Sequence, residues 1–70
     1  MYKLCLVQDR WSKYWSWYLQ PTEPHDWPFD KERAEFSGIH MEVRGAVKMA
    51  HELVPRSKVE YVYMDRRVAV

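Results

Sequence analysis

A chain of 70 residues is long enough for one small domain, and an aromatic content of 16% argues against a disordered tail. The single cysteine, Cys5, excludes an internal disulfide, and the formal net charge of +1 argues against binding nucleic acid by charge alone. No stretch approaches the roughly 20 apolar residues of a membrane helix, and no signal-peptide core follows the start. We therefore expect a soluble, cytoplasmic protein with no membrane partner.

The first half of the chain predicts a β-hairpin followed by a loop. Residues 2–7 and 14–20 alternate like half-buried strands, with residues 8–13 as the turn. In the second strand the core set is Trp15, Trp17 and Leu19, and the opposite set is Tyr14, Ser16 and Tyr18. A shift of one residue would exchange the two sets. The prolines of residues 21–30 exclude a helix or a central strand there, and Trp27 and Phe29 are expected to pin this loop onto the domain.

The second half predicts a helix followed by a strand. Residues 31–36 fit either a short helical turn or an edge strand. Residues 41–53 carry an apolar stripe at helical spacing, made of Val43, Ala46, Val47, Ala50 and Leu53. Pro55 ends this helix, because a proline forces the residue before it toward an extended shape. Gly45 within the helix indicates either close approach of a bulky neighbour, such as a tryptophan, or a glycine that is merely tolerated.

Residues 59–64 predict a further strand from their β-branched and aromatic content, residues 65–67 a turn, and residues 68–70 a short last strand or a tail. The helix would pack on one face of the sheet, and its expected partners are Leu4, Leu6, Trp15, Trp17, Leu19, Val62 and Met64. The predicted fold is a single α+β domain over residues 1–70. It has a three- to four-stranded, mainly antiparallel sheet with one α-helix packed on one face, in the order ββαβ(β).

Side chains that could carry chemistry are scattered along the chain. The histidines His25, His40 and His51 lack metal-ligand spacing, and Cys5 lies in an apolar strand, which favours a buried structural thiol. Only two glycines are present, so no phosphate-binding loop can form. We therefore predict a protein that is not an enzyme and has no metal or cofactor. Residues 21–35 hold five acidic and two basic side chains, which could face a partner or form an ordinary solvated loop.

A single helix covers only one sheet face, so several aromatic side chains are left without an internal position. Tyrosine and tryptophan beside arginine are typical of binding hot spots. The predicted partner-binding residues are Arg10, Trp11, Lys13, Tyr14, Tyr18, Tyr61, Tyr63, Arg66 and Arg67. A protein partner is the favoured interpretation. Self-association as a homodimer and binding of single-stranded nucleic acid by base stacking are the alternatives, and the weak net charge disfavours the last.

The segment Phe36–Pro55, followed by Val59–Tyr63, resembles a pattern found in small phage proteins that take over the host. There, a strand leads into a helix with two alanines four residues apart, as Ala46 and Ala50 are here, and a turn and a strand follow. The pattern is similar to anti-CRISPR proteins and to the phage inhibitor of bacterial RNA polymerase. The resemblance implies an inhibitor, most specifically an anti-CRISPR, that acts in a bacterial cytoplasm by occluding a host enzyme or ribonucleoprotein complex.

Overall fold

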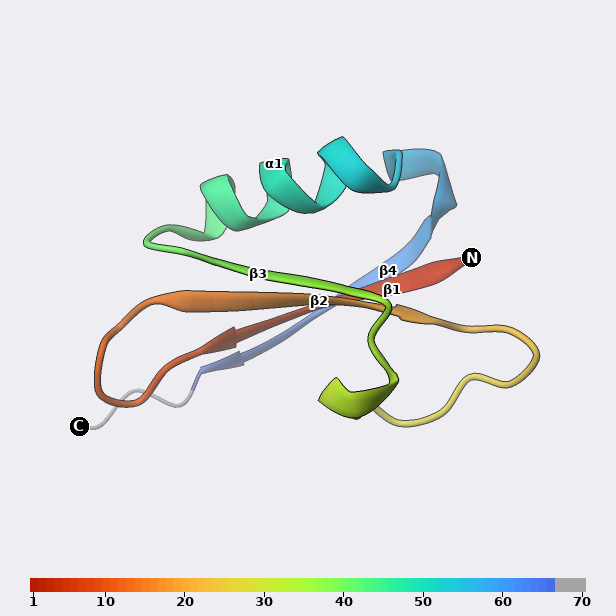
Figure 1. Ribbon diagram of the computed structural model, residues 1–70, viewed down its shortest axis with the longest axis horizontal. Coiled ribbons are helices and arrows are strands. Elements are labelled where there is room, and N and C mark those ends of the chain that lie inside the picture. Colours follow the sequence, from red (N-terminus) through yellow and green to blue (C-terminus); the bar gives the residue numbers. More distant parts are fainter. Residues whose placement is uncertain (67–70) are drawn as a thin grey trace.

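A four-stranded sheet with one helix on one face forms the domain, and the computed structural model describes residues 1–66 of it (Figure 1). The elements in chain order are β1 (Tyr2–Gln8), β2 (Trp15–Pro21), the 3₁₀ turn η1 (Lys31–Arg33), β3 (Phe36–His40), α1 (Val43–Leu53), the 3₁₀ turn η2 (Arg56–Lys58) and β4 (Val59–Arg66). The strands lie in the order β3-β2-β1-β4. The β1–β2 and β2–β3 pairs are antiparallel, whereas β1 and β4 are parallel. The predicted α+β class, the hairpin and the single helix are confirmed.

The fourth strand lies before the helix, a position that the sequence left ambiguous. Residues 31–36 supply both of the expected structures, a 3₁₀ turn and then the first residue of β3. Helix α1 carries the chain from β3 back across the sheet, which lets β4 run parallel to β1. The turn expected at residues 65–67 is wrong for its first two residues, because Asp65 and Arg66 continue β4. The last strand expected at residues 68–70 and Arg67 itself lie outside the described residues.

The core lies between α1 and the two inner strands of the sheet, β1 and β2. Trp15, Trp17 and Leu19 are buried, as their alternation predicts. They pack with Leu4 and Leu6 of β1 against Ala46, Ala50 and Val54. Burying a large aromatic side chain removes roughly 150–250 Å² from water, a gross gain of about 4–6 kcal/mol at about 25 cal/mol per Å². The two core tryptophans are therefore the largest contributors to this small core.

Helix α1 packs mainly over β2 and β3 and contacts β1 less. Val62 and Met64, which were expected to supply core contacts for the helix, are not part of the buried core. By register both residues stand beside Leu4 and Leu6 on the helix side of the sheet, yet each is about half exposed. The strand was assigned to the correct face, but the sequence pattern does not show how far across the sheet the helix extends.

Both glycines make room for a ring. A Cβ at Gly38 would lie 2.5 Å from the indole of Trp17, which stands opposite it in the β2–β3 pair. A Cβ at Gly45 would lie 2.0 Å from the imidazole of His40, whose Nδ1 accepts the N–H of Glu42 at the start of α1. The expected bulky neighbour of Gly45 is thus present, but it is a histidine, and the tryptophan lies over Gly38 instead.

Candidate binding groove

The face of the sheet away from α1 is partly covered by the proline-rich loop, residues 22–30. The side chain of Phe29 packs on the ring of Tyr18, with ring centroids 5.2 Å apart. Tyr18 was expected to lack an internal contact, and Phe29 supplies one. The predicted pinning of the loop is therefore confirmed for Phe29. The Trp27 side chain, in contrast, is exposed, and the loop is held there by its backbone carbonyl.

Lys3 is the main anchor of the loop. Its side chain is only 5% exposed, and its Nζ donates to Asp26 Oδ1 at 2.9 Å and to the Trp27 carbonyl. The Tyr61 hydroxyl of β4 donates to the same Asp26 carboxylate at 2.8 Å. The hydrogen bonds from Lys3 and Tyr61 lower the pKa of Asp26. Burial alone would lower the pKa of Lys3, but the hydrogen bond to Asp26 leads the contacts that outweigh burial and leave it raised.

Gln20 is the second anchor, and it satisfies backbone groups that the prolines leave without partners. Its Nε2 donates to the carbonyls of Trp27 and Pro28, both at 3.2 Å. Its Oε1 accepts the N–H of Asp30 at 2.9 Å. Because Gln20 is almost completely buried, the loop is tied to β2 by a shielded amide as well as by Lys3.

At the other end of this face, the turn between β1 and β2 holds Trp11 in solvent. The carboxylate of Asp9 accepts the backbone N–H groups of Trp11 at 2.6 Å and Ser12 at 2.9 Å, and these bonds lower its pKa. Lys13 closes the turn in the left-handed region, with φ of 65°. Trp11 is 82% exposed, with the Arg10 guanidinium 5.4 Å from its ring centroid. The backbone around Trp11 is therefore fixed while its ring is left free of core contacts.

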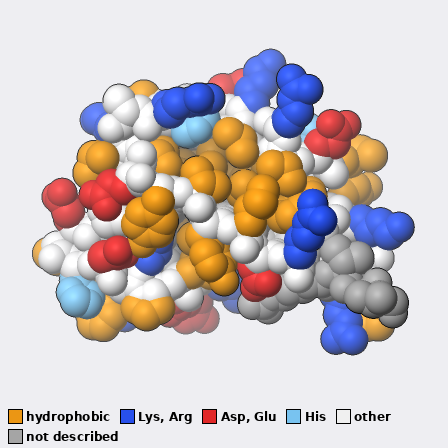
Figure 2. All heavy atoms as spheres, turned by 180° about the vertical axis from the view of Figure 1, so that it is seen from behind, with side chains coloured by type: hydrophobic (Ala, Val, Ile, Leu, Met, Phe, Trp, Pro, Cys, Tyr) orange, Lys and Arg blue, Asp and Glu red, His pale blue; other side chains and the backbone are white. Residues whose placement is uncertain are grey.

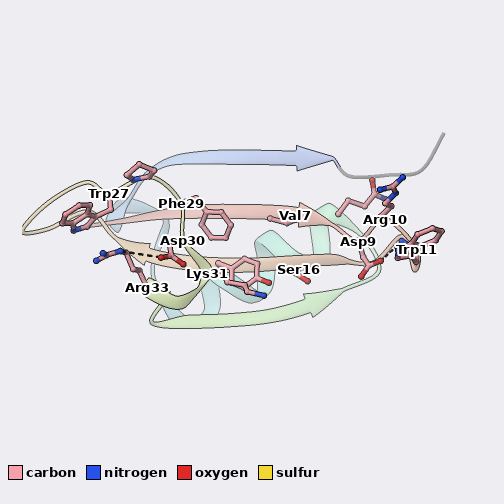
Figure 3. Close-up of a pocket in the computed structure, with 13 residues that line it drawn as sticks. Val7, Asp9, Arg10, Trp11, Ser16, Trp27, Phe29, Asp30, Lys31 and Arg33 are labelled. Carbon is pink, nitrogen blue, oxygen red and sulfur yellow. Dashed lines mark hydrogen bonds and ion pairs between the residues drawn. The ribbon is translucent and has the colours of Figure 1, made fainter.

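A groove of about 760 Å³ runs between this turn and the proline-rich loop. Figure 3 shows Trp11 and Arg10 at one end, Trp27 and Arg33 at the other, and Phe29 between them. The guanidinium of Arg33 lies 4.4 Å from the Trp27 ring centroid, so a tryptophan–arginine pair flanks each end. Asp30 accepts the N–H of Glu32 and lies 3.8 Å from Arg33. The groove combines flat aromatic surface with both signs of charge.

The structure does not bring the nine predicted partner-binding residues together on one surface. Arg10, Trp11 and Tyr18 line the groove. Tyr61 and Tyr63 line a smaller hollow on β4, beside Pro28 and Phe29. Tyr14 and Lys13 belong to the turn and do not line the groove, and the guanidinium of Arg66 lies 5.9 Å from the Trp15 ring. Arg67 lies outside the described residues.

The aromatic and basic lining residues that were missed from the sequence lie in and just after the loop: Trp27, Phe29, Lys31 and Arg33. The sequence offered one signal for the position of this loop, in Lys3 and Gln20. Each places a polar side chain on the strand face opposite the core, where a buried polar group needs a partner. Those partners come from the loop, and so does the far end of the groove.

The described residues offer no metal centre and no reactive thiol. Within residues 1–66 no three histidine, cysteine or acidic side chains cluster as metal ligands would. Cys5 is fully buried, and burial raises the pKa of its thiol to about 11. No helix in this part of the chain is long and apolar enough to cross a membrane. Comparison with family models, with curated proteins and with solved structures finds no match to this chain.

Proposed function

We propose that this chain is a non-enzymatic binding protein that holds a segment of a protein partner in the groove between its two tryptophan–arginine pairs. The observation that carries the proposal is Trp11. A tryptophan that is 82% exposed, on a turn fixed by Asp9, contributes nothing to the core, yet it stands where a partner can cover it. The far end of the groove is held in place by Lys3 and Gln20, so little ordering is needed when a partner binds.

The charges in the groove favour a peptide over a nucleic-acid strand. The groove is lined by basic side chains and by the carboxylates of Asp9 and Asp30. These two carboxylates would repel a chain of phosphates. A peptide can match both signs of charge and place apolar side chains on Phe29. Single-stranded nucleic acid is the second candidate, supported by one specific observation, which is that both groove tryptophans carry an adjacent guanidinium as in base-stacking sites.

The finer hypothesis, an inhibitor that occludes a host enzyme or ribonucleoprotein and specifically an anti-CRISPR, rests on the sequence resemblance of residues 36–63. An occluding inhibitor needs a rigid surface and no turnover, and the anchored groove would supply such a surface. Residues 36–63 contribute β3, α1 and β4 but no lining residue of the groove. The hypothesis on the partner's identity and the proposal on the groove can therefore fail independently.

The test is capture of partners from bacterial lysate by the immobilised chain, with Trp11→Ala and Met41→Ala compared side by side. Met41 is 69% exposed and does not line the groove, so it is a matched loss of exposed apolar surface. We expect the wild type and Met41→Ala to capture one protein in stoichiometric amount, and Trp11→Ala not to capture it. Equal capture by all three chains would refute it. Capture that disappears after nuclease treatment and weakens steeply with salt would favour the nucleic-acid alternative.

A further inference from the structure

Strand β4 is an edge that the rest of the described chain leaves open. Its inner side pairs with β1, and no strand within residues 1–66 pairs with its outer side. Four consecutive residues at its centre, Tyr61 to Met64, are each between 41% and 51% exposed. Figure 2 views the molecule from the β4 side, and hydrophobic side chains extend across its middle beneath the basic side chains at the top.

The centre of this edge lacks the features that keep sheet edges from pairing. Natural edge strands are usually short, or carry prolines or charged side chains at their centre. At eight residues β4 is the longest strand, and its charged residues Glu60, Asp65 and Arg66 lie toward its two ends. Its one irregularity is a register shift at Glu60, which has no partner in β1 between the pairs Tyr2–Val59 and Lys3–Tyr61, and it lies before the central residues Tyr61 to Met64. The outer edge, Tyr61 to Met64 included, is therefore open to a pairing strand.

The sequence of β4 complements itself when two copies pair antiparallel about Tyr63. A two-fold axis perpendicular to the sheet keeps each face continuous, so residues pair only with residues of the same face. With the axis at Tyr63, Val62 stands opposite Met64 of the second copy, and Glu60, at the irregularity of the strand, lies level with Arg66. Each dimer then gains two pairs of opposite charge and a tyrosine pair at its centre.

The neighbouring registers are poorer. An axis at Val62 sets Glu60 against Met64 and leaves Arg66 level with Lys58, which lies in η2 before the strand and carries the same charge. An axis at Met64 leaves Val62 facing the arginine instead. Pairing of β4 with β3 of another copy would be head-to-tail and would leave a free edge at each end, so that assembly would not close at two copies.

We infer that this chain forms a homodimer through antiparallel pairing of β4 with β4, centred on Tyr63, to give one eight-stranded sheet. The partner is a second copy because Glu60 and Arg66 are spaced symmetrically about Tyr63 and carry opposite charge. The interface uses the β4 edge and leaves the groove between Trp11 and Trp27 unoccupied. It is therefore separate from the proposed function, and either can fail without the other.

Sedimentation of the whole chain over the micromolar range tests the dimer. The wild type is expected to be a dimer, and Tyr63→Lys a folded monomer, because two ammonium groups would meet at the axis. Ile39→Lys is the matched control, since Ile39 is 55% exposed on the other edge strand, and it is expected to remain a dimer. A wild type that is monomeric throughout, a Tyr63→Lys that still dimerises, or species that grow beyond two copies would each overturn the inference.

The register is tested by exchange of charge. Glu60→Arg alone and Arg66→Glu alone are each expected to weaken the dimer about tenfold, because two attractive pairs become repulsive. The double variant is expected to recover wild-type affinity. Independently, Tyr63→Cys should form a disulfide across the axis on oxidation, whereas Val62→Cys, two residues out of register with its own copy, should not. Cys5 stands opposite Tyr63 in the β1–β4 pair and could form a disulfide with Tyr63→Cys within one copy, so both cysteine variants are made in a Cys5→Ala background. No recovery in the double variant, or crosslinking through Val62→Cys, would refute the register.

Discussion

Gly38→Ala is the sharpest test of how the sheet is packed. A methyl group at Gly38 would lie 2.5–2.7 Å from three atoms of the Trp17 indole, and Trp17 is 2% exposed with core neighbours around it. Overpacking of this kind typically costs about 1–3 kcal/mol of stability. Because the Trp17 ring has no free space to move into, we expect a cost near the upper end of this range. Replacing glycine in a strand returns roughly 0.5–1 kcal/mol of backbone entropy. We expect a net loss of about 2 kcal/mol, or roughly 10 °C in Tm for a domain of this size.

Gly45→Ala is the natural contrast, because its ring neighbour can move. The imidazole of His40 is only partly buried and can rotate away, at the loss of its hydrogen bond to the Glu42 N–H. That loss costs about 1 kcal/mol, and removing a glycine from a helix returns about the same. We therefore expect the free energy of unfolding of Gly45→Ala to lie within about 0.5 kcal/mol of the wild-type value. Urea unfolding followed by tryptophan fluorescence measures both variants on the same scale.

The Trp17→Phe background separates the ring clash from any other effect of the methyl group. No acceptor among the described residues lies within hydrogen-bonding distance of the Trp17 Nε1, so the smaller ring removes an unsatisfied donor along with the crowded atoms. In that background the cost of Gly38→Ala should fall below about 1 kcal/mol. A Gly38→Ala protein as stable as the wild type, or an unchanged cost beside the phenylalanine, would refute the packing argument.

Three further outcomes follow from burial and charge. Ala50→Asp should unfold the domain, because Ala50 is fully buried, whereas Val47→Asp should cost less since Val47 is only partly buried; circular dichroism distinguishes them. The pKa of Asp26 is lowered and that of Lys3 is raised, so the loop anchor should hold between about pH 4 and pH 10 and weaken outside that window; hydrogen exchange of the loop amides measures this. Lys3→Met should reduce the dependence without abolishing it, because the Tyr61 hydroxyl still donates to Asp26. Burial raises the pKa of Cys5 to about 11, so thiol labelling at pH 8 should proceed only through unfolding, and a labelling rate independent of urea would contradict this.

The hairpin and the helix could be predicted from the sequence because their signals are local. The alternation of Trp15, Trp17 and Leu19 fixes which face is buried, since a one-residue slip would move all three into solvent. The helical stripe likewise places Ala46 and Ala50 against the sheet. Leu53, at the end of the same stripe, is 53% exposed, and there α1 ends and the chain becomes extended at Val54.

The groove could not be predicted because it depends on contacts far apart in the sequence. Lys3 meets Asp26, and Gln20 reaches past three prolines to the backbone of Asp30. Neither contact has a periodic signature, and a loop without secondary structure gives no pattern from which to read its path. Trp11 was predicted as a binding residue because the alternation of the two strands leaves it no position in the core. Trp27 was assigned to the packing of the loop, although its ring faces solvent beside Arg33.

The proposed dimer has a consequence for how the groove would act. A two-fold axis perpendicular to the sheet places both helices on one side of the eight-stranded sheet and both open faces on the other. Two grooves, each flanked by Trp11 and Trp27, would then face the same way. One dimer could engage two neighbouring copies of a partner, and the second contact would form at high effective concentration.

Binding to a dense surface of partner therefore distinguishes the dimer from the groove itself. Tyr63→Lys should bind free partner in solution as the wild type does, because Tyr63 does not line the groove. On partner immobilised at high density, the same variant should dissociate at least about tenfold faster than the wild type, since only one groove can engage. Trp11→Ala should lose binding in both formats. If Tyr63→Lys dissociates from the dense surface as slowly as the wild type, the two grooves do not act together.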